Sequence, residues 1–310
     1  MKTLKSWGLA AIILSLVSAC GKTQPATPQA APTESPQAPT EMPAEEPTAI
    51  PEPVEEHGTP LPPDPQKITF TASDGQELHG YYYPADHASA PLVVLMHWVN
   101  GDESDWNEVA IWLQNRGIDN PFENPAGMPW WDPSWFPAVD AGTSYGVFAF
   151  SLRGCEPFPN GCSGFKINEW YLDIQAAMTQ ASLLDGVDPN RIVAIGSSIG
   201  ADGAAMGCAW LNNEKPGSCQ GALSLSPGNY MAVPYAASIE QLCTMDHAKA
   251  VWCLADDGQE GAFCEKAGDY PEYKPLLIKN GDHGNMLLKP GLNPLPMQLI
   301  LDFLKLTVGG

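Results

Sequence analysis

One short stretch constrains the fold of this chain more than any other, the run Arg191-Ile-Val-Ala-Ile-Gly-Ser-Ser-Ile-Gly-Ala201. An apolar, β-branched segment leads directly into Gly196-Ser-Ser-Ile-Gly200, and small residues follow it. This pattern predicts a strand, a sharp turn and a helix, with Ser198 strained and exposed above the end of the strand. Glycines are required on both sides because strand and helix approach each other closely there. Ser198 is therefore a candidate nucleophile; the alternative is an ordinary serine in a glycine-rich turn.

The N-terminus has the pattern of an export signal. Lys2 and Lys5 precede a short apolar run, Leu9 to Val17, which is too short to span a bilayer as a permanent helix. The run ends in Val17-Ser-Ala-Cys-Gly21, which resembles the lipobox of bacterial lipoproteins, and this resemblance implies cleavage before Cys20 and a lipid on its sulfur. We expect residues 1–19 to be the signal peptide. The alternative is ordinary signal cleavage and a secreted protein without a lipid.

Residues 20–66 have the composition of a linker. Thirteen prolines lie between positions 21 and 66, together with Ala, Thr, Gln and Glu and almost no large apolar side chains. Such a segment cannot bury enough surface to offset its chain entropy, so we expect an extended tether. The lipid would then be the chain's single link to a membrane, at the cell envelope. By the same resemblance this is the outer membrane in a bacterium with two membranes, or the outer face of the cell membrane.

The composition becomes that of a globular domain at Lys67, and 67–310 is long enough for one domain with a large core. The whole chain has 36 acidic and 15 basic residues, a net charge of −21. This balance argues against nucleic acid as a partner and against direct adsorption to anionic lipid. The oligomeric state does not follow from these features.

The cysteines fit an oxidising compartment. Seven follow Cys20, and short spacings favour three local disulfides, Cys155–Cys162, Cys208–Cys219 and Cys253–Cys264, with Cys243 left over. Spacing does not determine connectivity, so these pairs are hypotheses. A metal site is the competing interpretation, but no Cys-x-x-Cys motif or pair of closely spaced histidines supports it, and we expect no metal.

Strand and helix patterns alternate through the domain after an N-terminal β-hairpin over 67–83. Strands are expected at 91–97, 145–152, 192–196, 221–226, 250–254 and 276–279, and helices at 103–117, 168–184, 199–211 and 294–306. This alternation predicts an α/β fold with a mostly parallel central sheet covered by helices on both faces.

A long connection, Asp119 to Thr143, interrupts this order and is rich in proline and tryptophan. It could form an aromatic binding surface or a partial lid, or it could be a packed loop covering a hydrophobic edge. We favour the packed loop, because helix-to-strand connections normally lie at the end of a sheet opposite to the functional loops.

A serine nucleophile needs a base, and a third group that orients the base. His283 lies in Lys279-Asn-Gly-Asp-His-Gly-Asn285, a glycine-rich loop after the last expected strand, and is the candidate base; an uninvolved surface histidine is the alternative. The candidate acid is Asp257, with Asp256 as the alternative, because both follow the strand at 250–254 at its carboxyl end. The doublet could instead cap a helix.

The order of the candidate residues along the chain is Ser198, Asp257, His283, which is the order in the α/β-hydrolase fold. The sequence resembles this family, in particular its dienelactone-hydrolase-like and small-esterase branches. Leu92-Val-Val-Leu-Met-His97, the run Phe150-Ser-Leu-Arg-Gly154 and Ser226-Pro-Gly228 also fit the family. The resemblance implies a Ser-His-Asp triad acting without metal or organic cofactor. It also implies two oxyanion donors, the backbone amides of Ile199 and Val99.

The chain departs from the family at Trp98, where glycine is usual, which puts the second oxyanion donor in question. His97 and Trp98 are candidate pocket residues, Trp98 as a wall of an acyl pocket. About twenty residues separate Pro227 from the next strand, too few for a large helical cap. An open pocket and small or water-soluble substrates are therefore expected.

These expectations describe a lipid-anchored serine hydrolase outside the cytoplasm, acting through an acyl-enzyme on a small-molecule carboxylic ester. Peptide or lactone hydrolysis uses the same residues, so the sequence does not separate them. An alternative from a different functional class is a binding module without catalytic activity, with the same fold, at the cell surface.

Overall fold

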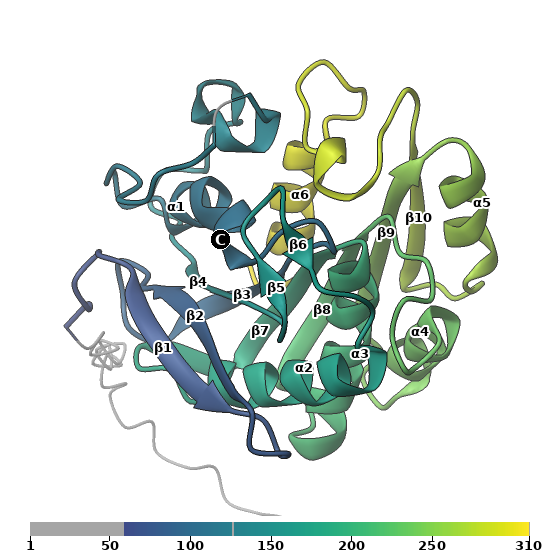
Figure 1. Cartoon of the computed structure of the whole chain (residues 1–310), viewed down its shortest axis with the longest axis horizontal. Helices are drawn as coiled ribbons and strands as arrows, with labels where there is room; N and C mark the ends of the chain where they lie inside the picture. Colours follow the sequence, from purple (N-terminus) through teal and green to yellow (C-terminus); the bar gives the residue numbers. More distant parts are fainter. Residues whose placement is uncertain (1–58, 126, 310) are drawn as a thin grey trace, which may run out of the picture. The chain divides into compact units, whose positions relative to one another are not determined.

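The computed structural model describes residues 59–125 and 127–309 of the chain (Figure 1). The expected signal peptide, Cys20 and nearly all of the linker lie outside the described residues. Among the residues described, none of the helices combines the length and the hydropathy that crossing a bilayer requires.

The domain is built on an eight-stranded sheet with the strand order β1-β2-β4-β3-β7-β8-β9-β10. Its strands are β1 (Gln66–Thr71), β2 (Glu77–Tyr83), β3 (Ala90–Met96), β4 (Gly146–Phe150), β7 (Val187–Ser197), β8 (Cys219–Leu225), β9 (Ala250–Asp256) and β10 (Tyr273–Ile278). The first two strands form an antiparallel hairpin and β2 pairs antiparallel with β4, while all further pairs are parallel. The mostly parallel sheet and its N-terminal hairpin are therefore confirmed.

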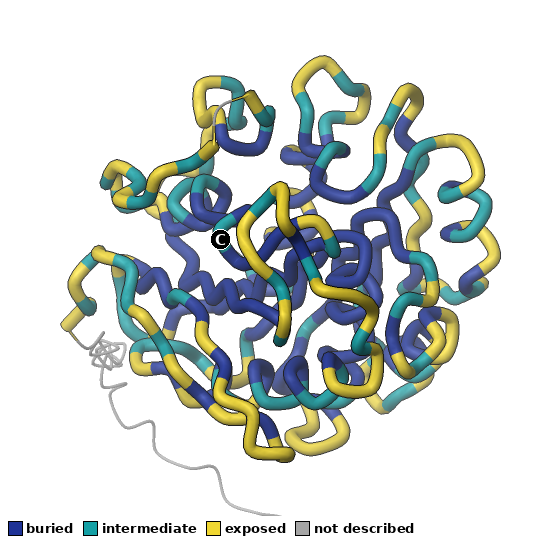
Figure 2. Tube along the Cα trace, in the orientation of Figure 1, coloured by how far each residue is buried: buried dark blue, intermediate teal, exposed yellow. Residues whose placement is uncertain are grey.

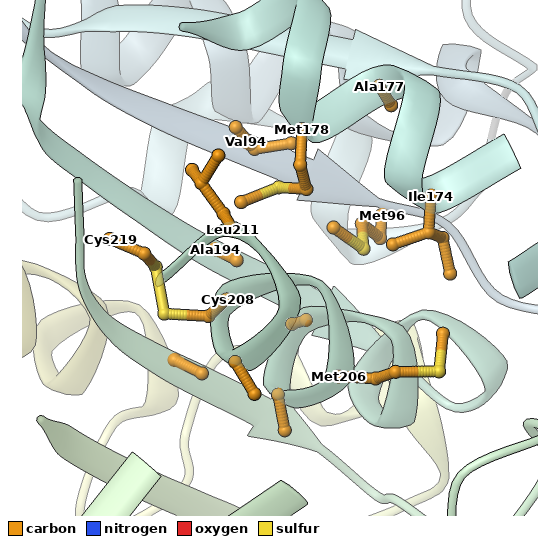
Figure 3. Packing of buried hydrophobic residues seen from close by; sticks show 14 of the residues in the cluster. Val94, Met96, Ile174, Ala177, Met178, Ala194, Met206, Cys208, Leu211 and Cys219 are labelled. Carbon is orange, nitrogen blue, oxygen red and sulfur yellow. A yellow bond between two sulfur atoms is a disulfide. The ribbon is translucent and has the colours of Figure 1, made fainter. Parts of the chain in front are cut away.

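Helices cover both faces of this sheet. They do so because the central strands present apolar side chains to each face. On β3, Val94 and Met96 pack in one core with α2 (Ile167–Ala181), α3 (Ile199–Glu214) and α4 (Tyr235–Thr244), as Figure 3 shows in part. Val93 and Leu95 point to the other core, which contains α1 (Asn107–Gln114) and α6 (Pro296–Thr307). Figure 2 shows that the central strands are buried, whereas β1 and β2 at one side of the sheet are partly exposed.

The parallel strands end at one edge of the sheet, and the candidate residues follow those ends. Met96 is paired with Gly196, Ser197 with Leu225, and Asp256 with Ile278. The segments after β3, β7, β9 and β10 therefore emerge side by side, in the place where α/β sheets bind ligands.

Several short elements were not predicted from the sequence. The helix expected at 103–117 is a 3₁₀ turn, η1 (Glu103–Trp106), followed by α1, which ends at Asn115 in a left-handed conformation. A small separate hairpin, β5 (Cys155–Glu156) and β6 (Gly161–Cys162), follows β4. The helix α5 (Gln259–Lys266) follows β9, and its mixed charged sequence has no clear apolar period.

The three expected disulfides are all present, Cys155–Cys162, Cys208–Cys219 and Cys253–Cys264. Cys243 on α4 is the free cysteine of the described part of the chain, and it is buried. Burial raises the pKa of its thiol to about 11, with a further contribution from the charge of Glu272.

The proline- and tryptophan-rich connection forms two short 3₁₀ turns, η2 (Pro129–Trp131) and η3 (Pro133–Trp135). Trp130 and Trp131 are buried, as a packed loop requires, while most other described residues of the connection are half-buried or exposed. The expectation about its position is wrong, however, because Trp130 packs edge-on against Trp98, with ring centroids 5.6 Å apart. Trp98 follows β3, so the connection reaches the edge of the sheet where the candidate residues gather.

Candidate active site

Ser198 lies in the sharp turn that the sequence predicts. It joins β7 to α3 with φ 53° and ψ −114°, a strained combination for a residue with a side chain. Its amide donates a hydrogen bond of 2.8 Å to the carbonyl of Leu225 on the neighbouring strand, so the turn is tied to the sheet. The turn is therefore confirmed, but the expected exposure of the serine is wrong, because Ser198 is buried.

The glycines on either side of Ser198 are required by close backbone packing. A Cβ added to Gly196 would lie 1.8 Å from the carbonyl oxygen of Gly200. A Cβ added to Gly200 would lie 2.3 Å from the carbonyl oxygen of Met96 and 2.6 Å from that of His97. No larger side chain fits at either position without moving the backbone, so the start of α3 lies directly against the end of β3.

His283 is brought to Ser198 by the loop after β10. Its Nε2 lies 2.9 Å from Ser198 Oγ, a hydrogen-bonding distance. The approach depends on Gly284, which has φ +60° and whose added Cβ would lie 2.8 Å from Ser197 Oγ. The Gly284 amide donates to Ser226 Oγ at 3.1 Å, so the end of β8 holds this loop.

The carboxylate beside His283 belongs to Glu260 and not to Asp257. His283 Nδ1 lies 2.6 Å from Glu260 Oε1. Asp257 is exposed in the turn after β9, and no hydrogen bond joins it to His283 among the described residues. The side chain of the alternative acid, Asp256, lies close to Gly258 in the same loop. A Cβ added to Gly258 would lie 2.8 Å from Asp256 Oδ2. The acid expected at the end of the strand is thus replaced by one on the following helix.

Two features fix α5, and with it Glu260, against the sheet. The disulfide Cys253–Cys264 joins β9 to the helix. A Cβ added to Gly261 would lie 2.4 Å from the carbonyl oxygen of Asp256, so the helix backbone lies close to the strand end. The sequence analysis missed Glu260; the one signal near it is the hypothetical Cys253–Cys264 bond, which brings the residues after β9 back beside that strand.

The two expected oxyanion donors are the backbone amides of Ile199, directly after Ser198, and of Val99, in the loop after β3. Ile199 is the first residue of α3, so its amide has no partner within the helix. Val99 lies in the loop after β3, and its carbonyl accepts a hydrogen bond of 2.8 Å from the Cys162 amide. Neither the Ile199 nor the Val99 amide donates to an acceptor within residues 59–125 and 127–309. Both amides therefore stay candidates for the oxyanion hole.

His97 and Trp98, the candidate pocket residues, are buried in the loop after β3. His97 is fully buried; Leu152 N donates to its Nε2 at 3.0 Å, so Nδ1 carries the proton and donates to Trp98 O at 2.7 Å. Burial lowers the pKa of His97, which favours this neutral form. The Trp98 indole donates to Asp105 Oδ2 at 2.7 Å, and Asp105 Oδ1 is buried without a partner.

A carboxyl group in these surroundings is hard to ionise. Burial raises the pKa of Asp105 to about 7; the Trp98 hydrogen bond opposes this, and the nearby charges of Asp102 and Glu103 add to it.

One group of side chains has the composition of a metal site but is fully engaged in other bonds. Ligand atoms of His97, Cys155 and Cys162 lie within 4.8 Å of one another. The two sulfurs form a disulfide, and both nitrogens of His97 take part in hydrogen bonds. These residues therefore do not fit a metal ion in this state.

A pocket of about 630 Å³ opens beside Glu260 and not directly over Ser198. Its walls include Gly228, Tyr230, Phe263 and Lys266. Asp202, in the first turn of α3, supports this wall by accepting hydrogen bonds from three successive amides, those of residues 228–230. Burial raises the pKa of Asp202 to about 6, and the three hydrogen bonds oppose the shift. The pocket gives a bound molecule space next to Glu260.

Comparison with solved structures identifies the fold. An esterase of Pyrococcus furiosus superposes with a TM-score of 0.55 at 14% identity, covering 79% of this chain and 92% of that one. The dienelactone hydrolase of Anabaena variabilis gives 0.53 at 12% identity, covering 81% and 100%. A thermostable carboxylesterase cloned from a metagenomic library gives 0.53 at 13% identity, covering 80% and 90%. The chain has the α/β-hydrolase fold.

Comparisons of the sequence itself found no match. No family model matches the chain, and no curated protein matches it either. At these identities the structural likeness shows the fold alone, so an argument about activity has to come from the site.

Proposed function

We propose that this protein is a serine hydrolase that cleaves carboxylic esters through an acyl-enzyme. The observation that supports this most strongly is the series of contacts from Ser198 Oγ to His283 Nε2, at 2.9 Å, and from His283 Nδ1 to Glu260 Oε1, at 2.6 Å. A nucleophile, a base and a group that orients the base are the three parts that acyl transfer by serine needs. The names of the structural neighbours, two esterases and a dienelactone hydrolase, agree with this reaction class.

In the proposed reaction, Ser198 Oγ attacks the ester carbonyl while His283 Nε2 takes its proton. Glu260 accepts the hydrogen on Nδ1, which selects the useful tautomer and stabilises the imidazolium that forms. His283 then gives the proton to the departing alcohol. Water, activated by the same histidine, attacks the acyl-serine and releases the acid, which restores the hydroxyl of Ser198.

Negative charge collects on the carbonyl oxygen in the tetrahedral states, and the amides of Ile199 and Val99 are the proposed donors to it. Removing one such donor typically costs about 3–4 kcal/mol of transition-state stabilisation. The pocket beside Glu260 is open to solvent and has polar and aromatic walls, which favours small or water-soluble esters. Lactones and peptides remain alternative substrates for the same residues.

Covalent labelling tests this proposal. A fluorophosphonate should add once to the folded protein, as measured by intact mass, and the adduct should be absent from Ser198→Ala. The matched control is Ser197→Ala, which removes the adjacent buried hydroxyl that has no hydrogen-bond partner and should keep the adduct. Hydrolysis of p-nitrophenyl acetate and butyrate should follow the same pattern. Equal rates for wild type and Ser198→Ala would refute the enzyme and favour a binding module.

Attachment to the cell envelope through a lipid on Cys20 is a separate proposal, and it rests on the sequence around that cysteine. Replacing Cys20 by serine should move the protein from the membrane fraction to the soluble fraction of the producing bacterium. Retention of the variant in the membrane fraction would contradict the lipid anchor and leave the proposed reaction unaffected.

A further inference from the structure

The loop after β3 is held in place by the small hairpin β5–β6. The Cys162 amide donates to the carbonyl of Val99 at 2.8 Å. A Cβ added to Gly161, which has φ +66°, would lie 2.5 Å from the same carbonyl oxygen and 2.7 Å from Asn100 Cα. The backbone of β6 is therefore in direct contact with residues 99 and 100, and a side chain at position 161 would separate them.

The turn of the hairpin makes a second contact, this time with a side chain. The ring of Phe158 stacks on Trp98, with ring centroids 5.9 Å apart and an angle of 11° between the planes. Trp98 is held from the other side by Trp130 and by its hydrogen bond to Asp105. The tryptophan that replaces the glycine usual in the resembled family is thus an anchor, and Phe158 is one of its partners.

These two contacts fix the orientation of one particular amide. The N–H of Val99 belongs to the peptide plane between residues 98 and 99. The Trp98 side chain restrains one end of that plane, and the hydrogen bond to the Val99 carbonyl restrains the residue at its other end. An oxyanion donor acts only if it is aimed beforehand at the oxygen that becomes charged.

The backbone pairing of the hairpin is short, and its disulfide closes it covalently. Each strand has two residues, and an isolated hairpin of this size is at best marginally stable in water. Cys155 and Cys162 face each other in the pairing register and close the hairpin with a disulfide across a separation of seven residues. Much of the turn, including Glu156 and Asn160, is exposed, so burial contributes little to its shape.

We propose that the disulfide-closed hairpin Cys155–Cys162 is a positioning element for oxyanion stabilisation, because it holds the loop that presents the Val99 amide to the reacting carbonyl. This role rests on the proposed function. Breaking the disulfide should misdirect the donor without changing the nucleophile, the base or the pocket. The loss should therefore fall on the tetrahedral state and not on binding of the ester.

The experiment compares two disulfide deletions in the full chain. Cys155→Ser with Cys162→Ser removes the hairpin bond, and Cys208→Ser with Cys219→Ser removes a bond between α3 and β8, which begins at the opposite edge of the sheet. Both should lower Tm. Only the first should lower kcat on p-nitrophenyl butyrate, by about 10- to 100-fold, since losing a whole donor costs about 10²–10³. KM should change less than about threefold, and a trifluoromethyl ketone should bind more weakly by the same factor as kcat falls.

A second variant keeps the disulfide. Phe158→Ala removes the ring that stacks on Trp98 and should lower kcat less than the disulfide deletion does, whereas Phe158→Tyr should restore wild-type kcat. Equal kcat losses in the two disulfide deletions, or a loss confined to KM, would overturn the positioning role.

Hydrogen–deuterium exchange separates this proposal from the proposed function. Exchange in the peptide covering residues 97–101 should rise in the Cys155/Cys162 variant and stay at the wild-type level in the Cys208/Cys219 variant. Unchanged exchange would show that the hairpin does not hold the loop, whatever the activity. If exchange increases but the protein hydrolyses no ester, the hairpin does hold the loop after β3. The role of the hairpin in oxyanion stabilisation would then be refuted together with the proposed function.

Discussion

Ser198 and most of the loop after β3 are buried, whereas the side chains of His283 and of the carboxylate beside it are partly exposed. Ser198 is 2% exposed, while the side chains of His283 and Glu260 are 34% and 32% exposed. The buried side is fixed mainly by backbone contacts that leave no room for a Cβ, and the exposed side by side chains on a short helix and a loop. We conclude that the two sides should fail differently, the buried side by unfolding and the exposed side by loss of activity.

Gly200→Ala should break the buried side and have the largest effect. The new Cβ would lie 2.3 Å and 2.6 Å from two backbone carbonyl oxygens, which have no flexible end that could move away. We expect the free energy of unfolding to fall by more than about 4 kcal/mol, measured by urea denaturation. The control is Gly217→Ala, where φ is +87° but no atom lies within 4 Å of the added carbon, and about 1–2 kcal/mol is expected. Similar costs at the two positions would contradict the packing argument.

Glu260→Gln should break the exposed side while the protein stays folded. Glutamine keeps an oxygen that can accept from His283 Nδ1 but loses the negative charge that stabilises the imidazolium. Water reaches this part of the site, so we expect a loss in kcat of about 10²- to 10³-fold, or about 3–4 kcal/mol in the activation barrier. Steady-state hydrolysis of p-nitrophenyl butyrate measures it. Asp257→Asn should stay within about twofold of wild type; the reverse ranking would return the role of acid to Asp257.

Asp105→Asn should sharpen the comparison by making the buried side more stable. The pKa of Asp105 is about 7 in the folded protein, against 3.8 as its ordinary value. Between these values the folded protein binds more protons than the unfolded one, so the free energy of unfolding falls as pH rises. Between pH 5 and pH 7 the loss should be about 2 kcal/mol.

Asparagine removes this dependence and keeps an oxygen for the Trp98 indole. In urea denaturation, the gain in stability of Asp105→Asn over wild type should be larger by about 2 kcal/mol at pH 7.5 than at pH 5. An exposed control, Asp257→Asn, should leave the pH dependence unchanged. Equal pH dependence in wild type and Asp105→Asn would mean that Asp105 ionises normally in the folded protein.

The parts of the site that depend on local backbone geometry could be predicted from the sequence. Gly196 and Gly200 fix the turn around Ser198, and the glycines beside His283 allow its loop to reach the serine. The parallel sheet followed from alternating strand and helix patterns for the same reason, since each pattern is a property of neighbouring residues.

The acid could not be predicted in this way, because its position depends on tertiary contacts. Glu260 lies on a helix without an apolar period, and its place is set by a disulfide and by the close approach of Gly261 to β9. The bracing of Trp98 is of the same kind. Its partners Asp105, Trp130 and Phe158 come from three separate segments, and the sequence does not show that they meet.

Cys243 has a consequence for the three disulfides of the folded protein. Thiol–disulfide exchange begins with attack by a thiolate, and a free cysteine beside three disulfides would normally catalyse their rearrangement. With a pKa of about 11, only about one Cys243 side chain in 10⁴ is ionised at neutral pH, and the sulfur is also buried on α4. The leftover thiol is thus kinetically inert while the domain is folded, and scrambling of the disulfides should begin only when α4 detaches from the core.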